Sequence, residues 1–404
     1  MQALFWCLVA IIAYTYAGYP LVVLAAGTVL RRRVRRDRSG RSEGKDRPTV
    51  SVIVAAYDEA DGIEERIRNL LASDYPSDRL EVVIASDGST DRTVELASAV
   101  DPTHVRVLDL PRRGKAAALA TGAEEARGDI LVFTDANTVF RADALAALVS
   151  NFADPDVGGV AGHTTYLVDE GTGSAGRGEG LYWRYDTWLK QLETWTGSVV
   201  SAHGGMHAIR RELFRPIEDP AVTDDFAIST SVVAQGRRLV FEPSAIGYER
   251  PMATTGSEFQ RRVRLMTRGL RGILLRRELL DPFRSGFYAV AFVSRKVLRR
   301  LLPLTFLPLL VTSVMLADEG AVYALTAAVQ LCVLFAGVLG WALRGTAAAR
   351  SPLLYAPFFF CMANLASLAA LWNVARGRRV ERWTPQRHDA VTGPLSPATG
   401  GPSQ

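Results

Sequence analysis

The sequence is poor in cysteine, with only three among 404 residues, and it contains no visible internal repeat. All three cysteines lie inside apolar stretches far apart along the chain: Cys7, Cys332 and Cys361. A disulfide framework or a cysteine-based zinc site requires cysteines at short, regular spacing. The sequence therefore excludes both kinds of site.

Charged residues are absent between residues 3 and 30, a stretch long enough to cross a bilayer as a helix. Six arginines follow within a few residues: Arg31, Arg32, Arg33, Arg35, Arg36 and Arg38. A secretory signal peptide would carry its positive charge before the apolar stretch. We therefore expect residues 1–31 to form an uncleaved transmembrane helix, with its N-terminus outside and the following chain in the cytoplasm.

The formal net charge of +5 comes partly from arginine clusters beside apolar stretches. Arginines in such positions usually face the cytoplasm and its anionic lipids. We therefore expect membrane lipids, and not nucleic acid, to be the partner of these clusters.

Short apolar runs alternate with helical patterns between residues 47 and 255. The runs expected to be strands are 51–57, 80–85, 105–108, 130–133, 157–161 and 238–242. The segments expected to be helices include 63–71, 93–100 and 114–127. Such alternation predicts an α/β domain with a mainly parallel, Rossmann-like sheet.

Polar side chains follow the apolar run 130–133 directly, in the order Thr134, Asp135, Ala136 and Asn137. Buried parallel strands present their chemistry at their carboxyl ends, where ligands of open α/β sheets bind. Two oxygen ligands at such an end suit Mg²⁺ or Mn²⁺ bridging a diphosphate. Taken alone, the same residues are equally typical of a strand that ends in a turn.

The remainder of the chain changes character after the α/β domain. An aromatic segment at 177–196 predicts either a helix at the membrane interface or a core helix or acceptor platform. Residues 256–300 are expected to form basic amphipathic helices at the interface, residues 301–376 transmembrane helices, and residues 384–404 a disordered tail.

The membrane topology contains a conflict between two signals. Four spans would leave the C-terminus outside, whereas the arginines around the last span favour the cytoplasm: Arg376, Arg378, Arg379 and Arg382. We expect four crossings, and a re-entrant or interfacial segment near residues 286–317 would reconcile the two signals.

Several short motifs follow one another in a characteristic order across residues 51–250. They are Ala56-Tyr57-Asp58-Glu59, Ser86-Asp87-Gly88-Ser89-Thr90-Asp91, Gly114-Lys115, Thr134-Asp135-Ala136-Asn137 and Thr223-Asp224-Asp225. In this order and spacing the chain resembles a membrane-bound family 2 glycosyltransferase with a GT-A fold, in the branch that contains polysaccharide synthases. Each motif by itself is weak.

The resemblance implies a role for each motif. Tyr57, Glu59 and Asp87 would hold the uridine of a nucleotide sugar, and Lys115 would lie near the nucleotide. Asp135 and Asn137 would place a divalent metal, Mg²⁺ or Mn²⁺, on the diphosphate, with lower metal affinity because Asn137 replaces a carboxylate.

The acceptor side follows from the same resemblance. Asp225 matches the catalytic base of the family, and Asp224 is the alternative if Asp225 serves only as a helix cap. His203, Gly204 and Gly205 would lie near the acceptor sugar.

The resemblance fails at one motif. Processive members of the branch carry Gln-x-x-Arg-Trp, whereas here Val263 and Arg264 occupy the last two positions after Gln260. Arg262 and Arg264 either contact the diphosphate or belong to a solvated or lipid-facing basic helix face. We therefore expect short products instead of a long polymer.

The resemblance implies an integral protein of the cytoplasmic membrane with several spans. Its expected activity is inverting transfer of a sugar, from a nucleotide sugar expected to be UDP-linked, to a glycan acceptor in cell-surface or exopolysaccharide synthesis. One alternative is transfer to a polyprenyl-phosphate lipid. Another is an inactive subunit that conducts or anchors a glycan.

Overall fold

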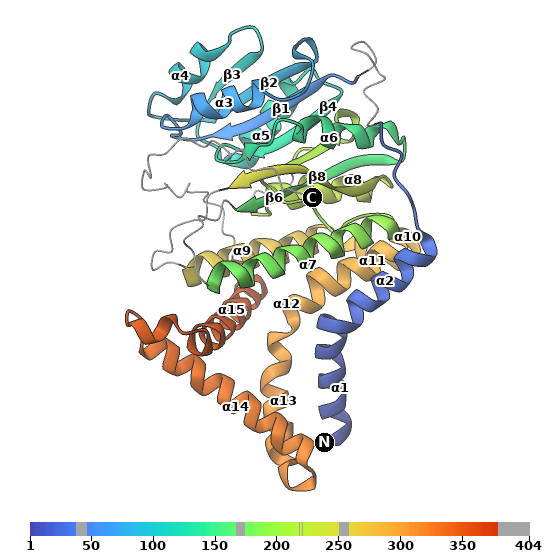
Figure 1. Cartoon of the computed structure of the whole chain (residues 1–404), viewed down its shortest axis with the longest axis vertical. Helices are drawn as coiled ribbons and strands as arrows, with labels where there is room; N and C mark the ends of the chain where they lie inside the picture. Colours follow the sequence, from blue (N-terminus) through green and yellow to red (C-terminus); the bar gives the residue numbers. More distant parts are fainter. Residues whose placement is uncertain (38–46, 167–173, 218, 220, 250–257, 379–404) are drawn as a thin grey trace, which may run out of the picture.

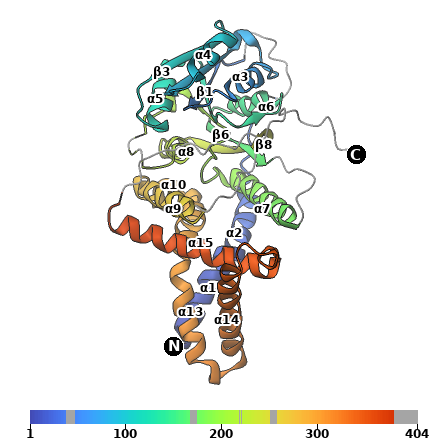
Figure 2. The same ribbon diagram turned by 90° about the vertical axis from the view of Figure 1, so that its left-hand side faces the viewer.

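The computed structural model covers the whole chain and describes residues 1–37, 47–166, 174–217, 219, 221–249 and 258–378. The predicted tail at 384–404 lies outside these residues. Figure 1 shows an α/β domain stacked on a layer of helices, with further apolar helices extending away from it. The N-terminal helix begins at the end of the molecule opposite the sheet (Figures 1 and 2).

One eight-stranded sheet forms the centre of the α/β domain, in the order β3-β2-β1-β4-β7-β6-β8-β5. Its strands are β1 Val50–Ala56, β2 Leu80–Asp87, β3 Val105–Leu110, β4 Ile130–Asp135, β5 Val139–Phe140, β6 Val157–Tyr166, β7 His207–Arg210 and β8 Arg238–Glu249. Strands β1 to β4 run parallel, β6 is parallel to β8, and β5 and β7 are antiparallel to their neighbours. The predicted α/β class with a mainly parallel sheet is confirmed.

Two layers of helices cover the sheet. These helices are α3 Ile63–Leu71, α4 Thr93–Val100, α5 Lys115–Glu125, α6 Ala144–Ser150 and α8 Asp224–Ala234. Alternate residues of β1 face opposite layers: Val52 and Val54 pack with α3, α4 and α6, whereas Ile53 packs with α5 and α8. Burial on both faces explains why this strand is an unbroken apolar run. Gly122 lets α5 approach closely, because a Cβ there would lie 2.8 Å from Ile53 Cγ2.

The layer below the sheet contains α7 Ser174–Thr196, α9 Glu258–Leu275, α10 Pro282–Ser285, α11 Phe287–Phe292 and α12 Arg299–Leu301, with a π-helical turn at Val293–Leu298. In α7, Leu189 and Leu192 are buried in the same cluster as Tyr19 and Val23 of α2. The aromatic rings of Tyr185, Trp188 and Trp195 remain partly exposed. These rings are therefore free to lie at a membrane interface, as one of the two hypotheses requires.

The apolar helices are α1 Gln2–Ala13 and α2 Tyr19–Leu30, joined by a π-helical turn at Tyr14–Gly18, and α13 Pro303–Met315, α14 Ala321–Ala342 and α15 Pro352–Ala375. Within the described chain, three helices are long and apolar enough to cross a membrane: Gln2–Leu30, Ala321–Ala342 and Pro352–Ala375. The pair Phe287–Leu301 and Pro303–Met315, bent by 59°, would add a fourth if it is one span. Phe5 and Leu8 of α1 pack with Leu309 of α13.

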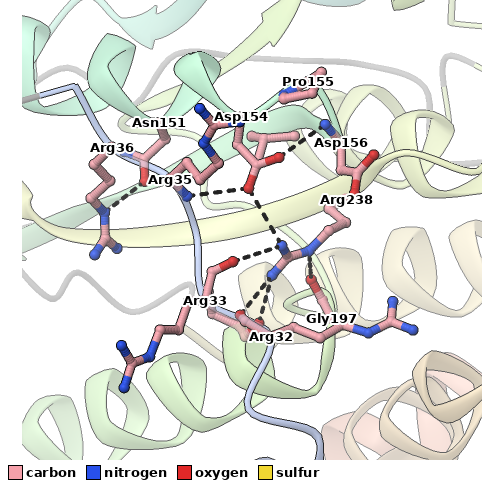
Figure 3. Close-up of polar contacts among 12 residues, drawn as sticks. Arg32, Arg33, Arg35, Arg36, Asn151, Asp154, Pro155, Asp156, Gly197 and Arg238 are labelled. Atoms are coloured by element: carbon pink, nitrogen blue, oxygen red, sulfur yellow. Dashed lines mark hydrogen bonds and ion pairs between the residues drawn. The ribbon is translucent and has the colours of Figure 1, made fainter.

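The arginine cluster after α2 is bound to the α/β domain (Figure 3). Arg36 forms a 2.7 Å ion pair with Glu242, whose side chain is fully buried, and the backbone N–H of Arg35 donates to Asp154. Arg238 donates to the carbonyl oxygens of Arg32 and Gly197. Part of the positive charge expected to face lipid therefore ties the first helix to the domain.

Candidate active site

Three strand ends meet at one edge of the sheet. Ala55 of β1 aligns with Asp135 of β4, and Ala56 aligns with Ser86 of β2, so Tyr57, Asp87 and Asp135 leave the sheet side by side. Parallel strands with matched register place their carboxyl ends together, which is why motifs far apart in the sequence converge here.

Asp87 is fully buried, and its carboxylate holds the loop before α5. It accepts hydrogen bonds from the backbone N–H groups of Arg113 at 2.7 Å and Gly114 at 2.8 Å, and it pairs with Arg112 at 2.6 Å. Gly114 adopts φ +98°, which favours glycine. The uridine contact expected of Asp87 stays a prediction, and the structure adds that the carboxylate fixes Arg112 and the start of α5.

Arg112 was not identified from the sequence, yet it covers the ring of Tyr57. Its guanidinium lies 3.4 Å from the ring centroid. The loop after Tyr57 is tied to the second motif, because the backbone N–H groups of Asp58 and Glu59 donate to Ser89 Oγ and Thr93 Oγ1. The loops of the two motifs expected to bind uridine are thus joined by hydrogen bonds, and the Tyr57 ring stacked under the Arg112 guanidinium lies beside them.

Lys115, the first residue of α5, joins two carboxylates from different motifs. Its Nζ donates to Asp135 Oδ1 at 2.6 Å and forms an ion pair with Asp224 Oδ2 at 2.8 Å. Burial alone would lower the pKa of Lys115, but the two carboxylates raise it above its ordinary value. Burial alone would raise the pKa of Asp224, but Lys115 holds it below its ordinary value. Lys115 and Asp224 are therefore both charged at neutral pH.

Asp225 differs from its neighbour Asp224. Its side chain is half-buried and makes no hydrogen bond or ion pair within the described part of the chain. The N-cap position of α8 is occupied by Thr223, so neither aspartate is the N-cap residue. Asp225 therefore has a carboxylate available in the first turn of the helix, where the helix dipole favours negative charge.

A glycine pair lies beside Asp135, just before β7. A Cβ on Gly204 would lie 3.3 Å from Asp135 Oδ2, and a Cβ on Gly205 would clash with Glu249 Oε1. Thr134 Oγ1 donates to the Gly205 carbonyl at 2.7 Å and accepts from Arg66, a buried arginine whose pKa burial lowers to about 9. A side chain at Gly205 would therefore displace its neighbours, and one at Gly204 would be tightly packed. The site also contains a carboxylate, Glu249, that sequence patterns did not single out.

His207 is the first residue of β7 and lies near the carboxylates of Asp225, Asp224 and Asp135. The ring is stacked on Phe133 with centroids 5.2 Å apart, and both ring nitrogens are buried without a hydrogen-bond partner among the described residues. Burial lowers its pKa, so the imidazole is neutral at pH 7. No motif pointed to this residue, because a single histidine in an apolar strand carries no pattern.

Gln260 and the residues after it, which replace the Gln-x-x-Arg-Trp motif, lie on α9. Within the described structure they form no ion pair with the Lys115 cluster, which consists of Lys115, Asp135 and Asp224. Gln260 is exposed, while Arg262 pairs with Glu258 at 2.8 Å and lies 4.1 Å from the ring centroid of Phe359 in α15. Arg264 is half-buried and forms no ion pair with that cluster in the part of the chain that the structure describes. Arg268, one turn further along, donates to the Val222 carbonyl at 2.8 Å and thereby supports the loop before Thr223.

The chain is similar in sequence to known glycosyltransferases. Residues 51–217 match the model of the family described as "Glycosyl transferase family 2". Poly-beta-1,6-N-acetyl-D-glucosamine synthase of Staphylococcus aureus (strain MSSA476) is 29% identical over 234 residues, which cover 56% of this chain and 56% of that protein. The probable glycosyltransferase YdaM of Bacillus subtilis (strain 168) is 25% identical over 234 residues, covering 55% of this chain and 56% of that protein.

Among solved structures, the mannosyltransferase PcManGT from Pyrobaculum calidifontis, in complex with GDP-Man and Mn²⁺, is similar in fold. It is 24% identical, the match covers 93% of this chain and 100% of that one, and the TM-score is 0.65. Residues 51–217 therefore form a family 2 glycosyltransferase domain, and this domain has the GT-A fold. The match spans about half the length of the curated relatives, 56% in each case.

Proposed function

We propose that this glycosyltransferase moves a sugar from a nucleotide sugar, expected to be UDP-linked, to a hydroxyl group of a glycan acceptor. One observation carries the proposal: Lys115 pairs with Asp135 and Asp224, whereas the neighbouring Asp225 forms no hydrogen bond or ion pair among the described residues. The name of the staphylococcal relative, a poly-beta-1,6-N-acetyl-D-glucosamine synthase, supports a role in exopolysaccharide synthesis.

Asp225 is the proposed general base of an inverting transfer. The acceptor oxygen forms a bond to the anomeric carbon as the bond to the diphosphate breaks, and the nucleoside diphosphate leaves with the electron pair. The hydroxyl proton passes to Asp225, which must lie within hydrogen-bond reach of it. Asp224 is a weaker candidate, because its interaction with Lys115 lowers its pKa.

A divalent cation, Mg²⁺ or Mn²⁺, fits the donor side of this site. Asp135 and Asn137 would hold it with oxygen ligands, and no group of three His, Cys, Asp or Glu side chains suited to a metal occurs in the described residues. Few protein ligands are expected where substrate phosphates complete the coordination. When bound, the cation would neutralise charge on the leaving diphosphate. The presence of Mn²⁺ in the PcManGT complex is consistent with this.

We further propose three membrane crossings, with the catalytic domain and the C-terminus both in the cytoplasm. The crossings would be α1–α2, the bent pair ending in α13, and α14. Helix α15 is also long and apolar enough to cross, but it runs across α13 and α14 below α9 (Figure 2), so we propose that it lies along the membrane surface. The chain just after α15 is held to α9, because Arg271 donates to the carbonyl oxygens of Gly377 at 3.1 Å and Arg378 at 3.2 Å. This arrangement removes the charge conflict found in the sequence. A reporter fused after Gln404 that is active only outside the cytoplasm would contradict it.

The function is tested with membranes that contain the full chain and a panel of nucleotide sugars. We expect one UDP-sugar to release nucleoside diphosphate in the presence of Mn²⁺ or Mg²⁺, and the release to be at least about 100-fold slower with Asp225→Asn membranes. Labelled product should stay in the aqueous phase, whereas extraction into organic solvent would identify a polyprenyl-phosphate acceptor. A chain that binds no nucleotide would be an inactive subunit.

A further inference from the structure

Glu249, the last residue of β8, lies next to the site but has no role in the mechanism above. It pairs with Tyr166 of β6 in the sheet, and its Oε1 accepts a 3.2 Å hydrogen bond from Thr138 Oγ1. Thr138 is fully buried and belongs to the short turn that carries Asp135 and Asn137. The carboxylate is therefore held at a fixed place beside the residues proposed to bind metal.

The glycine pair relates Glu249 to Asp135. A Cβ on Gly204 would lie 3.3 Å from Asp135 Oδ2, and a Cβ on the next residue, Gly205, would clash with Glu249 Oε1. Consecutive Cα atoms are only about 3.8 Å apart, so the two carboxylates lie over neighbouring positions of one bare loop. No side chain of that loop separates them.

The second oxygen of Glu249 is available to a ligand. Oε2 has no hydrogen bond among the described residues, and it is not among the atoms that are buried without a partner. Burial raises the pKa of this carboxyl group, against the opposing effect of the nearby His203 and with help from the charge of Asp135. A polar group in such surroundings gains from a hydrogen bond that replaces the water it loses.

We propose that Glu249 recognises the donor sugar by accepting a hydrogen bond from one of its ring hydroxyl groups. The inference rests on the proposed function, in which Asp135 holds the divalent cation that binds the diphosphate. In a nucleoside diphosphate sugar, the sugar ring is bonded directly to the diphosphate. Asp135 lies beside Gly204 and Glu249 lies beside Gly205, so a diphosphate held at Asp135 places the sugar ring near Glu249. Thr138 fixes one oxygen, and the other selects donors with a hydroxyl in the matching place.

The test compares Glu249→Ala and Glu249→Gln with the unchanged full chain in detergent. In Glu249→Ala, the affinity for the UDP-sugar should fall about 10- to 100-fold, the range for losing a hydrogen bond to a charged group. Glu249→Gln keeps an acceptor oxygen and should lose less. The affinity for UDP with Mn²⁺ should change less than about twofold in both variants, which also shows that they fold. Glu125→Ala, an exposed glutamate distant in sequence, serves as the control.

Deoxy analogues of the donor sugar, combined with the Glu249→Ala variant, test whether the residue and the hydroxyl group interact directly. Removing the recognised hydroxyl should weaken binding to the unchanged chain and have no further effect on Glu249→Ala. Additive losses, or an unchanged affinity in Glu249→Ala, would overturn the inference while leaving the proposed function intact. An equal loss of UDP and UDP-sugar binding would place Glu249 at the metal or diphosphate and overturn it as well. If the unchanged chain binds no nucleotide sugar, both proposals fail.

Discussion

The Nζ of Lys115 lies 2.8 Å from a carboxylate oxygen of Asp224. This ion pair gives Asp224 different surroundings from Asp225, its neighbour in the sequence. Asp224 and Asp135 both pair with the Lys115 ammonium group, while Asp225 forms no hydrogen bond or ion pair among the described residues. A helix places consecutive side chains about 100° apart, so neighbours readily acquire different surroundings. This difference supports Asp225 as the proposed base, with Asp224 as the alternative.

Asp225→Asn should abolish most activity without weakening donor binding. The substitution keeps the shape of the side chain and removes its ability to take a proton, so turnover should fall by about 10² to 10⁴. The KM for the donor should stay near its starting value, because the base acts mainly in the transition state. The measurement is the steady-state release of nucleoside diphosphate.

Asp224→Asn is the matched control for that experiment. It removes one of the two charged partners of Lys115, so we expect weaker donor binding and a lower melting temperature together with reduced turnover. Near-normal transfer by Asp225→Asn, with loss of transfer only in Asp224→Asn, would reverse the two roles.

Asn137→Asp should strengthen the dependence on metal. Asn137 is exposed and follows Asp135 by two positions, so a carboxylate there adds a charged ligand at the same turn. We expect the Mn²⁺ concentration for half-maximal activity to fall by roughly tenfold, since charged oxygen ligands increase affinity for divalent cations. Asp135→Ala should act in the opposite direction and lower nucleotide affinity and turnover together. An unchanged metal titration in Asn137→Asp would place residue 137 outside the metal site.

His207→Phe should stabilise the protein and reduce the loss of stability that acid causes. The buried ring nitrogens have no partner among the described residues, so replacing them by carbon should gain about 1 kcal/mol at pH 7. Burial holds the pKa of His207 below the ordinary histidine value of about 6.5. Below that pH the unfolded chain binds a proton that the folded protein does not, so stability falls as pH falls.

The readout for this variant is thermal unfolding in detergent between about pH 7 and about pH 5, the range in which an ordinary histidine titrates. The difference in stability between the His207→Phe variant and the unchanged chain should grow toward low pH. Part of the acid sensitivity should remain, because burial also lowers the pKa of His163. A variant less stable than the unchanged chain at pH 7 would show that the imidazole makes a favourable polar contact.

Arg295→Met should destabilise the contact between the first membrane helix and the layer below the sheet. Arg295 pairs with Asp186 and with Glu193 at 3.2 Å, and Glu193 also accepts a 2.6 Å hydrogen bond from Tyr19 of α2. Removing the arginine leaves two buried carboxylates with too little positive charge, which typically costs about 3–5 kcal/mol. Arg92→Met, which breaks an exposed pair with Glu95, is the control and should have little effect. Equal melting temperatures for the two variants would contradict this account.

The products should be short. The position that carries tryptophan in processive members is Arg264 here, and Gln260 is exposed on α9, so the motif supplies no aromatic surface on which an advancing sugar chain can stack. We expect labelled products of one or a few sugars on sizing columns. Arg264→Trp is the informative companion, since longer products from it would support the stacking argument, whereas a long polymer from the unchanged chain would refute it.

The sequence by itself determined the α/β class, the apolar helices and the order of the motifs. These features depend on local patterns: apolar runs such as 130–133 are long enough to identify a buried strand, and residues 3–30 contain no charge. Strands β5 and β7 were not predicted, because two and four residues form too short a run to stand out, and they are strands only because a neighbour supplies hydrogen bonds.

Tertiary structure alone decided how the charges of the site are paired. Lys115, Asp135 and Asp224 come from three separate motifs, and their contacts follow from the way α5, β4 and α8 meet, which no single segment encodes. The same holds for Arg112 over Tyr57 and for Glu249 beside Gly205: each pair is distant in sequence, and neither Arg112 nor Glu249 has a local pattern that marks it. Short-range periodicity predicts elements, but electrostatic partners depend on distances in space, and these are set only when the sheet and its helices pack together.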